Sequence, residues 1–270
     1  MLKTIEATAD YIRAIIEEKP EAGIILGSGL GGLIGDVRVL KQIPYEDIPG
    51  FPVSTVAGHN GMMIYGALGG KKVMALQGRF HYYEGYSMKE VTFPVRVMQR
   101  LGINTLFVSN AAGGLNPDYR IGDLVMLTDH INMFPEHPLH GKNEELLGPR
   151  FPDMSQAYDS EMCRLARQIA GEKGISLHEG VYVGVQGPSF ETPAEYRMYR
   201  IMGGDVIGMS TVPEVIVARH MGIKVFGISV VTDIGVPGEI VEVSHEEVQE
   251  VARAAEPGMT LLVKQLIALV

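Results

Sequence analysis

A ten-residue stretch, Gln77-Gly-Arg-Phe-His-Tyr-Tyr-Glu-Gly-Tyr86, gathers side chains that could bind an anionic, hydroxylated ligand. Arg79 could hold two oxygen atoms of an anion at once, because its guanidinium group is planar and always charged. His81 and the tyrosine hydroxyl groups beside it both donate and accept hydrogen bonds, which suits a hydroxylated ligand. A polar surface turn could have the same composition by chance, so this stretch alone leaves both interpretations open.

Polar residues with similar placement recur along the chain, each at or after the end of an apolar run that is typical of a buried strand. They are Ser28, Arg79, Asn110, Glu191, Ser210 and Asp233. Strands that converge at one edge of a sheet would bring these side chains together. We therefore expect them to share one ligand-binding cleft.

The elements that position these residues are expected to form one α/β domain spanning residues 1–270. The chain is 46% hydrophobic and 20% charged, and it contains 33 glycines, as expected for an enzyme-like fold with many tight loops. No Ser- or Pro-rich linker divides the sequence, and 270 residues is close to the upper limit for one core.

Secondary-structure signals alternate along the chain. Segments 62–68 and 72–77, joined by two glycines, predict a β-hairpin. Ser87 and Glu90 form a capping box that predicts a helix reaching residue 101, with Pro94 bending it or shifting its start. Further strands are expected at 104–109, 123–130, 178–186, 206–210 and 224–231, and a last helix begins near residue 244. Segment 131–159 has no clear periodicity, which favours an active-site or subunit-contact loop.

The glycine-rich segment 27–32 matches the G-x-G-x-x-G pattern of dinucleotide-binding proteins. That site needs a complete crossover helix, whereas Gly35 stops the helix here and a strand-like segment follows at 37–43. We therefore reject a dinucleotide site. The remaining interpretations are a plain tight turn, or a turn whose amide groups and Ser28 hydroxyl hold one phosphate-sized anion.

Charge and cysteine content exclude several classes of partner. The net charge is −9 and no run of Lys or Arg occurs, which argues against nucleic acid and anionic membranes. Cys163 is the only cysteine, so we expect no disulfide framework and a reducing compartment. The longest uncharged apolar run, at 22–35, is too short and too rich in glycine to span a bilayer. A cytoplasmic protein is expected.

Five longer motifs resemble those of the trimeric purine nucleoside phosphorylases and occur in the order typical of that family. They are Leu26-Gly-Ser-Gly-Leu-Gly31, Gly78-Arg-Phe-His-Tyr-Tyr-Glu-Gly-Tyr86, Asn110-Ala-Ala-Gly-Gly-Leu-Asn-Pro117, Gly187-Pro-Ser-Phe-Glu-Thr192 and Gly208-Met-Ser-Thr-Val-Pro-Glu214. The resemblance covers about residues 22–250. It implies a central, mixed and largely parallel β-sheet flanked by helices.

The resemblance also implies a reaction and a set of site residues. The family cleaves purine ribonucleosides or deoxyribonucleosides with inorganic phosphate to give the base and a pentose 1-phosphate. By motif match, phosphate would be bound by Ser28, His59, Arg79, His81, the Ala111 amide and Ser210. The sugar would be bound by Tyr83, Met209 and His245, and the base by Phe190, Glu191 and Asp233. Arg79, His81 and Asp233 are expected to be the catalytic residues.

Phosphate attack on an oxocarbenium-like C1′ needs no covalent nucleophile, because the phosphate charge stabilises the cation as the purine leaves. The family implies no cofactor or metal, and it implies a homotrimer. His81 and Tyr83 are two residues apart, so they would face the same side of an extended segment.

The sequence departs from the family pattern in two places. Segment 137–142 differs from the usual loop, and Phe134 is our candidate for the aromatic residue that enters a neighbouring subunit. Asp233 stands where most members have asparagine. Methylthioadenosine phosphorylases carry aspartate at this position, so a methylthioadenosine- or adenosine-preferring phosphorylase is the alternative. A non-catalytic nucleoside-binding protein is a second alternative, which the presence of Arg79, His81 and Glu191 disfavours.

Overall fold

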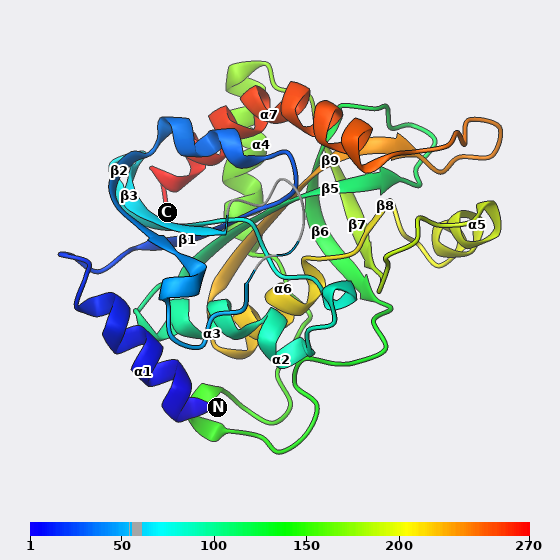
Figure 1. Cartoon of the computed structure of the whole chain (residues 1–270). Helices are drawn as coiled ribbons and strands as arrows, with labels where there is room; N and C mark the ends of the chain where they lie inside the picture. The colour runs from blue at the N-terminus through cyan, green and yellow to red at the C-terminus, as the bar shows by residue number, and fades with distance from the viewer. Residues whose placement is uncertain (54, 56–60) are drawn as a thin grey trace.

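A central β-sheet with helices on both faces forms the fold of the computed structural model, which describes residues 1–53, 55 and 61–270 (Figure 1). The strands are β1 (Ala22–Leu26), β2 (Arg38–Pro44), β3 (Met62–Leu68), β4 (Lys71–Gln77), β5 (Thr105–Gly114), β6 (Leu124–Asn132), β7 (Leu177–Gly184), β8 (Val206–Gly208) and β9 (Lys224–Ile234). The α-helices are α1 (Leu2–Arg13), α2 (Met88–Val91), α3 (Phe93–Arg100), α4 (Ser160–Lys173), α5 (Pro193–Ile201), α6 (Val212–His220) and α7 (His245–Ile267). Short 3-10 helices occur at Gly31–Asp36, Tyr45–Asp47, Tyr82–Glu84 and Glu145–Leu147.

The sheet is mixed, with the strand order β2-β3-β4-β1-β5-β8-β7-β6-β9 among the described residues. Strand β9 also pairs with β5, so the strands from β5 to β9 close on themselves. Strands β4, β1, β5 and β9 run parallel to one another, and their carboxyl ends therefore lie at the same edge. The expected α/β fold with a mixed, largely parallel sheet is confirmed.

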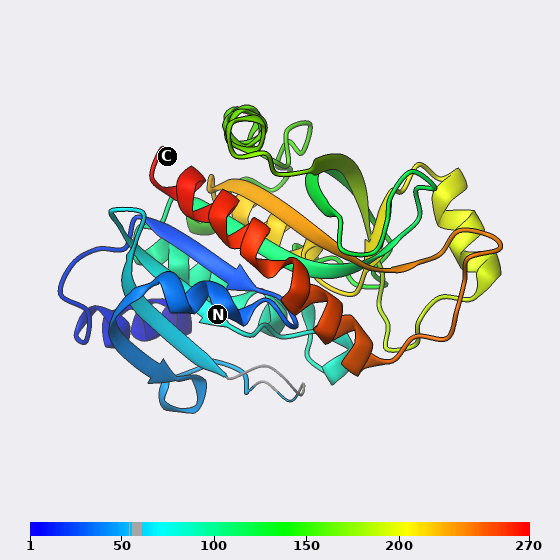
Figure 2. The same ribbon diagram turned by 90° about the horizontal axis from the view of Figure 1, so that it is seen from above.

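Helices α1, α2, α3 and α6 lie on one face of the sheet, while α7 crosses the other face (Figures 1 and 2). Helix α7 packs against both α4 and β9. Strand β1 is buried along its whole length, as expected for a continuous apolar strand covered on both faces. Across the described ranges, none of the helices combines the length and apolar character needed to cross a bilayer.

The single helix predicted from Ser87 to residue 101 is divided into two helices, α2 and α3. Ser87 caps α2 through the predicted capping box, but the helix breaks at Thr92 and α3 starts again with Pro94 in its first turn. A proline fits there because the first turn of a helix lacks acceptors for its N–H groups. The hairpin at β3 and β4 forms as predicted. Helix α1 ends at Arg13.

Two strands extend further than their apolar runs predict. Strand β5 reaches Gly114 and β9 reaches Ile234, because their carboxyl halves pair with each other beyond the buried core. Asn110, Ala111 and Asp233 consequently lie within strands and not in the turns that follow them. The segment between β6 and α4 contains only one 3-10 helix, which agrees with the predicted long loop.

Candidate active site

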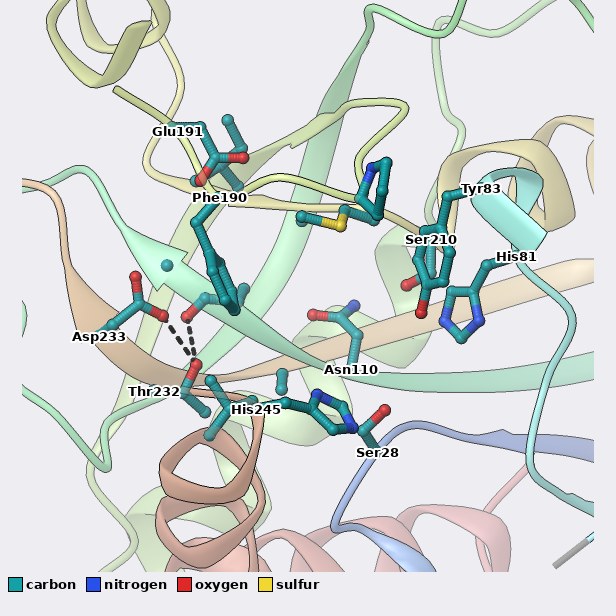
Figure 3. A pocket seen from close by; sticks show the side chains of 18 of the residues that line it. Ser28, His81, Tyr83, Asn110, Phe190, Glu191, Ser210, Thr232, Asp233 and His245 are labelled. Carbon is teal, nitrogen blue, oxygen red and sulfur yellow. Dashed lines mark hydrogen bonds between the residues drawn. The ribbon is translucent and has the colours of Figure 1, made fainter. Parts of the chain in front are cut away.

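A single cleft at the carboxyl edge of the sheet contains the predicted site residues that the structure describes, and its cavity volume is about 290 Å³ (Figure 3). It is lined by Ser28, Arg79, His81, Tyr83, Ala111, Phe190, Glu191, Met209, Ser210, Asp233 and His245, among others. His59 lies outside the described residues. The expectation that the strand ends share one cleft is therefore met for all six polar residues on which it was based, including Asn110.

Arg79 follows β4 and is 2% exposed, so its guanidinium group is fixed by protein contacts. Its Nη1 atom donates to the carbonyl oxygen of Ser109 at 2.7 Å and to Oγ of Ser210 at 3.2 Å. Its Nε atom donates to Oε1 of Glu214 at 3.1 Å. The positive charge of Arg79 is therefore held at a constant position beside the cleft. Glu214, which belongs to α6, forms the ion pair that holds it there.

The Ser210 hydroxyl group is placed by a strained turn between β8 and α6. Thr211 has φ 67°, which is unusual for a β-branched residue and costs on the order of 1–3 kcal/mol. Its hydroxyl group accepts a hydrogen bond from Nδ2 of Asn110 at 2.9 Å and lies 3.1 Å from Oγ of Ser210. Asn110 in turn accepts from Ser229 at 2.7 Å. These buried contacts hold the turn so that Ser210 faces the cleft.

His81 is nearly buried, and Glu84 fixes the orientation of its ring. Nδ1 of His81 lies 3.0 Å from Oε1 of Glu84, which also accepts the His81 backbone N–H at 2.7 Å. Burial lowers the pKa of His81, and Glu84 opposes this effect. Burial would raise the pKa of Glu84, but hydrogen bonds from His81 and Thr55 outweigh it and hold the pKa at about 2. These hydrogen bonds therefore keep Glu84 ionised near neutral pH.

His81 and Tyr83 face the cleft together, but for a different reason from the one we expected. The segment is not extended: Tyr82–Glu84 forms a 3-10 helix. The two rings nevertheless stack, with centroids 4.7 Å apart and an interplanar angle of 14°. Burial raises the pKa of Tyr83 to about 12, so its hydroxyl group stays protonated near neutral pH.

The middle of the cleft depends on Gly187. Its φ is +70°, and a Cβ atom there would lie 2.3 Å from Sδ of Met209 and 3.2 Å from the ring of Tyr83. Any side chain at this position would therefore push Met209 and Tyr83 apart. His245 completes this part of the cleft from the first residue of α7, where its Nε2 atom lies 2.9 Å from Nε2 of Gln249.

Two acidic residues, Glu191 and Asp233, line the end of the cleft opposite His81 (Figure 3). Asp233 is 6% exposed; its Oδ1 accepts from the Thr232 hydroxyl group at 3.0 Å and its Oδ2 accepts from the Tyr196 hydroxyl group at 3.2 Å. Asp233 therefore lies in β9 with its carboxyl group in the cleft.

Burial perturbs both of these carboxyl groups in the same direction. It raises the pKa of Glu191 to about 7, and the nearby Asp233 charge adds to this shift. Burial also raises the pKa of Asp233, although hydrogen bonds from Thr232 and Tyr196 oppose the shift. This end of the cleft can therefore retain a proton near neutral pH and can both donate and accept hydrogen bonds.

The long loop contains the two aromatic residues that could contact another subunit. Phe134 packs within its own chain, with its ring centroid 6.4 Å from that of Tyr82 and its edge close to Gly184. Phe151 is 88% exposed. The structure therefore favours Phe151 over Phe134 as the residue that needs a partner surface.

Three buried partners of the site were not predicted from sequence: Glu84, Glu214 and Tyr196. A signal for Glu84 existed, because it lies three residues after His81 and such pairs meet within one helical turn. Glu214 and Tyr196 gave no local signal, since they lie 135 and 37 residues from Arg79 and Asp233, respectively.

Among the described residues, no three His, Cys, Asp or Glu side chains lie close enough together to hold a metal ion. The cleft instead offers a fixed cation with hydroxyl donors at one end and two protonatable carboxyl groups at the other. Such an arrangement suits a ligand that is anionic at one end and carries polar ring atoms at the other.

Comparison with known proteins agrees with this geometry. The family model described as "Phosphorylase superfamily" matches residues 21–268. The chain therefore belongs to this superfamily. Within the superfamily the chain is 52% identical to purine nucleoside phosphorylase 1 of Bacillus subtilis, covering 99% of each chain.

Solved structures of Schistosoma mansoni purine nucleoside phosphorylase are similar along the whole chain. The complex with adenosine has a TM-score of 0.94 and 46% identity, covering 98% of this chain and 96% of the other. The complex with inosine has the same TM-score and 44% identity, covering 99% and 96%.

Proposed function

We propose that the protein catalyses the reversible phosphorolysis of purine ribonucleosides and deoxyribonucleosides, giving the free base and a pentose 1-phosphate. The observation that carries the proposal is that the two ends of the cleft differ in their chemistry. Arg79 and Ser210 form a fixed anion site at one end, and Glu191 and Asp233 form a site for polar ring atoms at the other. The relatives named above are purine nucleoside phosphorylases, and related structures contain inosine and hypoxanthine.

In this mechanism phosphate lies beside Arg79, Ser210, His81, Ser28 and the Ala111 amide. A phosphate oxygen attacks C1′ as the bond from C1′ to N9 breaks, and the bonding electron pair passes to the purine ring. Phosphate charge stabilises the cation that develops on the sugar, so no covalent enzyme intermediate is needed. The fixed position of the guanidinium group supplies the anion site without reorganisation during the reaction.

The nucleoside spans the rest of the cleft. Tyr83, Met209 and His245 contact the sugar, and Phe190 covers the base at the rim, where it is 42% exposed. Glu191 faces N1 of the purine, and Asp233 faces N7 and the substituent at C6. A proton on Asp233 can be donated to N7 or O6 as negative charge grows on the leaving base.

We propose that inosine and guanosine are the main substrates and that adenosine is also cleaved. An ionised Glu191 accepts the N1–H of a 6-oxopurine, and a protonated Asp233 donates to O6. An ionised Asp233 accepts the amino group of adenine instead. The runner-up function, methylthioadenosine phosphorolysis, is favoured by one specific feature, the aspartate at position 233.

The working unit in this proposal is a homotrimer in the cytoplasm that serves purine salvage. The 88% exposure of Phe151 and the length of its loop support a subunit contact. We assign His59 to the phosphate end by its motif alone. Inorganic phosphate is a co-substrate, and the mechanism uses no cofactor.

A substrate panel tests the proposal. Inosine, guanosine, adenosine and methylthioadenosine are each incubated with and without phosphate, and base release is followed by liquid chromatography. We expect phosphate-dependent release, fastest from inosine or guanosine. A strong preference for methylthioadenosine would establish the runner-up function, and no release from any nucleoside would reject catalysis.

A further inference from the structure

Tyr196 contacts Asp233 from outside the residues that line the cleft. It lies in the first turns of α5, it is 3% exposed, and its hydroxyl group donates to Oδ2 of Asp233 at 3.2 Å. The ring packs against the chain at Gly235, where a Cβ atom would lie 2.3 Å from Cδ1 of the tyrosine. Glycine at 235 therefore lets the tyrosine reach Asp233 at the end of β9.

Glu191 lies at the same end of the cleft, where its charge and that of Asp233 act on each other. A phenol has one hydrogen atom, and Tyr196 donates it to Asp233. The bond from Tyr196 stabilises the ionised form of Asp233, so a proton held at this end of the cleft favours Glu191. The Thr232 hydroxyl group, which donates to the other oxygen of Asp233, reinforces this arrangement.

We propose that Tyr196 is a specificity-determining residue: it biases the single proton shared by Glu191 and Asp233 toward Glu191 and thereby gives the site its activity on 6-aminopurines. Protonated Glu191 can donate to the bare N1 of adenine, while ionised Asp233 accepts from its amino group. The opposite arrangement, with the proton on Asp233, fits a 6-oxopurine. This inference rests on the proposed function for the orientation of the base.

No proton is gained or lost when the site changes between the two arrangements. The proton leaves one carboxyl group and the other carboxyl group takes it up, so the total charge of the pair stays the same. The other charged group that acts on Glu191 is Glu195, which raises its pKa slightly and is itself held by the backbone and hydroxyl group of Thr192. Burial remains the main cause of the raised pKa of Glu191.

Tyr196→Phe tests the inference, and Tyr199→Phe on the same helix is the matched control. Among the described residues, Tyr199 forms no side-chain hydrogen bond with Asp233, and it packs against the small apolar cluster to which Tyr196 belongs. Loss of the hydroxyl group should move the proton to Asp233, because a hydrogen bond that stabilises its ionised form is gone. We expect the ratio of kcat/KM for inosine to that for adenosine to rise about tenfold in Tyr196→Phe and to stay unchanged in Tyr199→Phe.

Combining the substitution with Asp233→Asn gives a second test, because an amide cannot hold the shared proton. In that background Tyr196→Phe should leave the ratio unchanged. An unchanged ratio in the single variant Tyr196→Phe, with inosine still cleaved, would overturn the inference and leave the proposed function intact.

Calorimetric binding of adenine and hypoxanthine to the wild-type protein gives a readout that does not need catalysis. In buffers of different ionisation enthalpy near neutral pH, we expect almost no net proton uptake with either base, because the proton only changes its position. Uptake of a whole proton with either base would contradict the shared-proton pair. If neither base binds and no nucleoside is cleaved, the proposed function itself is wrong.

Discussion

Nε of Arg79 lies 3.1 Å from Oε1 of Glu214, and both side chains are almost completely buried. An ion pair removed from water gains little net stability, but loss of one partner leaves an uncompensated buried charge. Oε2 of Glu214 has no hydrogen-bond partner among the described residues, so the carboxylate is held mainly by Arg79. Glu214 therefore positions the guanidinium group at the anion site and does not itself line the cleft.

We predict that Glu214→Gln lowers kcat/KM for phosphate at least tenfold and lowers Tm in phosphate-free buffer. The amide can still accept from Arg79 but no longer balances its charge. Added phosphate supplies that negative charge, so it should raise Tm more in the variant than in the wild type. Differential scanning fluorimetry across a phosphate series measures this difference.

Glu161→Gln is the control for this prediction, because Glu161 forms an exposed ion pair with Arg164 and exposed pairs contribute little. Equal phosphate shifts in Glu214→Gln and the wild type would show that Glu214 does not act through the anion site.

Arg79→Ala should nearly abolish activity, and Arg79→Lys should recover only part of it. Each hydrogen bond to a charged group is worth roughly 1.5–3 kcal/mol, and alanine removes all of them. A lysine ammonium restores the charge but not the fork that contacts Ser109, Ser210 and Glu214. Steady-state kinetics with varied phosphate should show a raised KM and a reduced kcat. Wild-type phosphate dependence in Arg79→Ala would place the anion elsewhere.

Asp233→Asn should improve inosine relative to adenosine by about tenfold, because the amide donates to O6 at every pH. In the wild type, oxopurine turnover should fall as pH rises through the raised pKa of Asp233, since ionisation removes the donor. The variant should lose this decline. Initial rates between pH 5.5 and 9 measure both effects. An unchanged substrate ratio would mean that Asp233 does not contact the base.

Glu191→Gln should stabilise the free protein more at pH 8 than at pH 5. Burial raises the folded-state pKa of Glu191 from 4.5 to about 7, so the folded state binds this proton more tightly than the unfolded state does. Stability contributed by the carboxyl group is therefore present at low pH and is lost as pH rises from about 4.5 to about 7. The difference should be on the order of 1–3 kcal/mol in urea unfolding. A pH-independent effect of Glu191→Gln would contradict the raised pKa.

Phe151→Ala should weaken or break the proposed trimer, whereas Phe134→Ala should mainly reduce the stability of the single chain. The first ring is 88% exposed, and the second packs beside Tyr82 in its own chain. Sedimentation velocity separates the two effects. A fully active wild-type monomer would reject the trimer and any role for Phe151 at an interface.

The fold was predictable where local signals were strong. The hairpin of β3 and β4 has its glycine turn, and the capping boxes at Ser87 and Ser244 mark helix starts. Gly35 was expected to stop the first short helix, but the 3-10 helix includes it and ends at Asp36. The extended ends of β5 and β9 were not predictable, because pairing between residues more than a hundred positions apart creates them.

The cleft was predictable from the placement of polar residues after apolar strands and from the family motifs. The groups that control those residues were harder to find. Glu214 is the last residue of the family motif 208–214, yet only the packing of α6 against the sheet shows that it contacts Arg79. Tyr196 and Asp233 are 37 residues apart, and no sequence pattern indicates that they form a hydrogen bond. Likewise, no local pattern indicates the burial that raises the pKa of Glu191.

The fate of the sugar in the reaction tests the central claim most directly. Inosine and the wild-type protein are incubated with and without phosphate, and the products are followed by phosphorus-31 NMR together with chromatography of the base. We predict that a sugar-phosphate signal appears in step with hypoxanthine and that neither forms without phosphate. Release of hypoxanthine at the same rate without phosphate, with free ribose as the second product, would contradict phosphorolysis and identify a hydrolase.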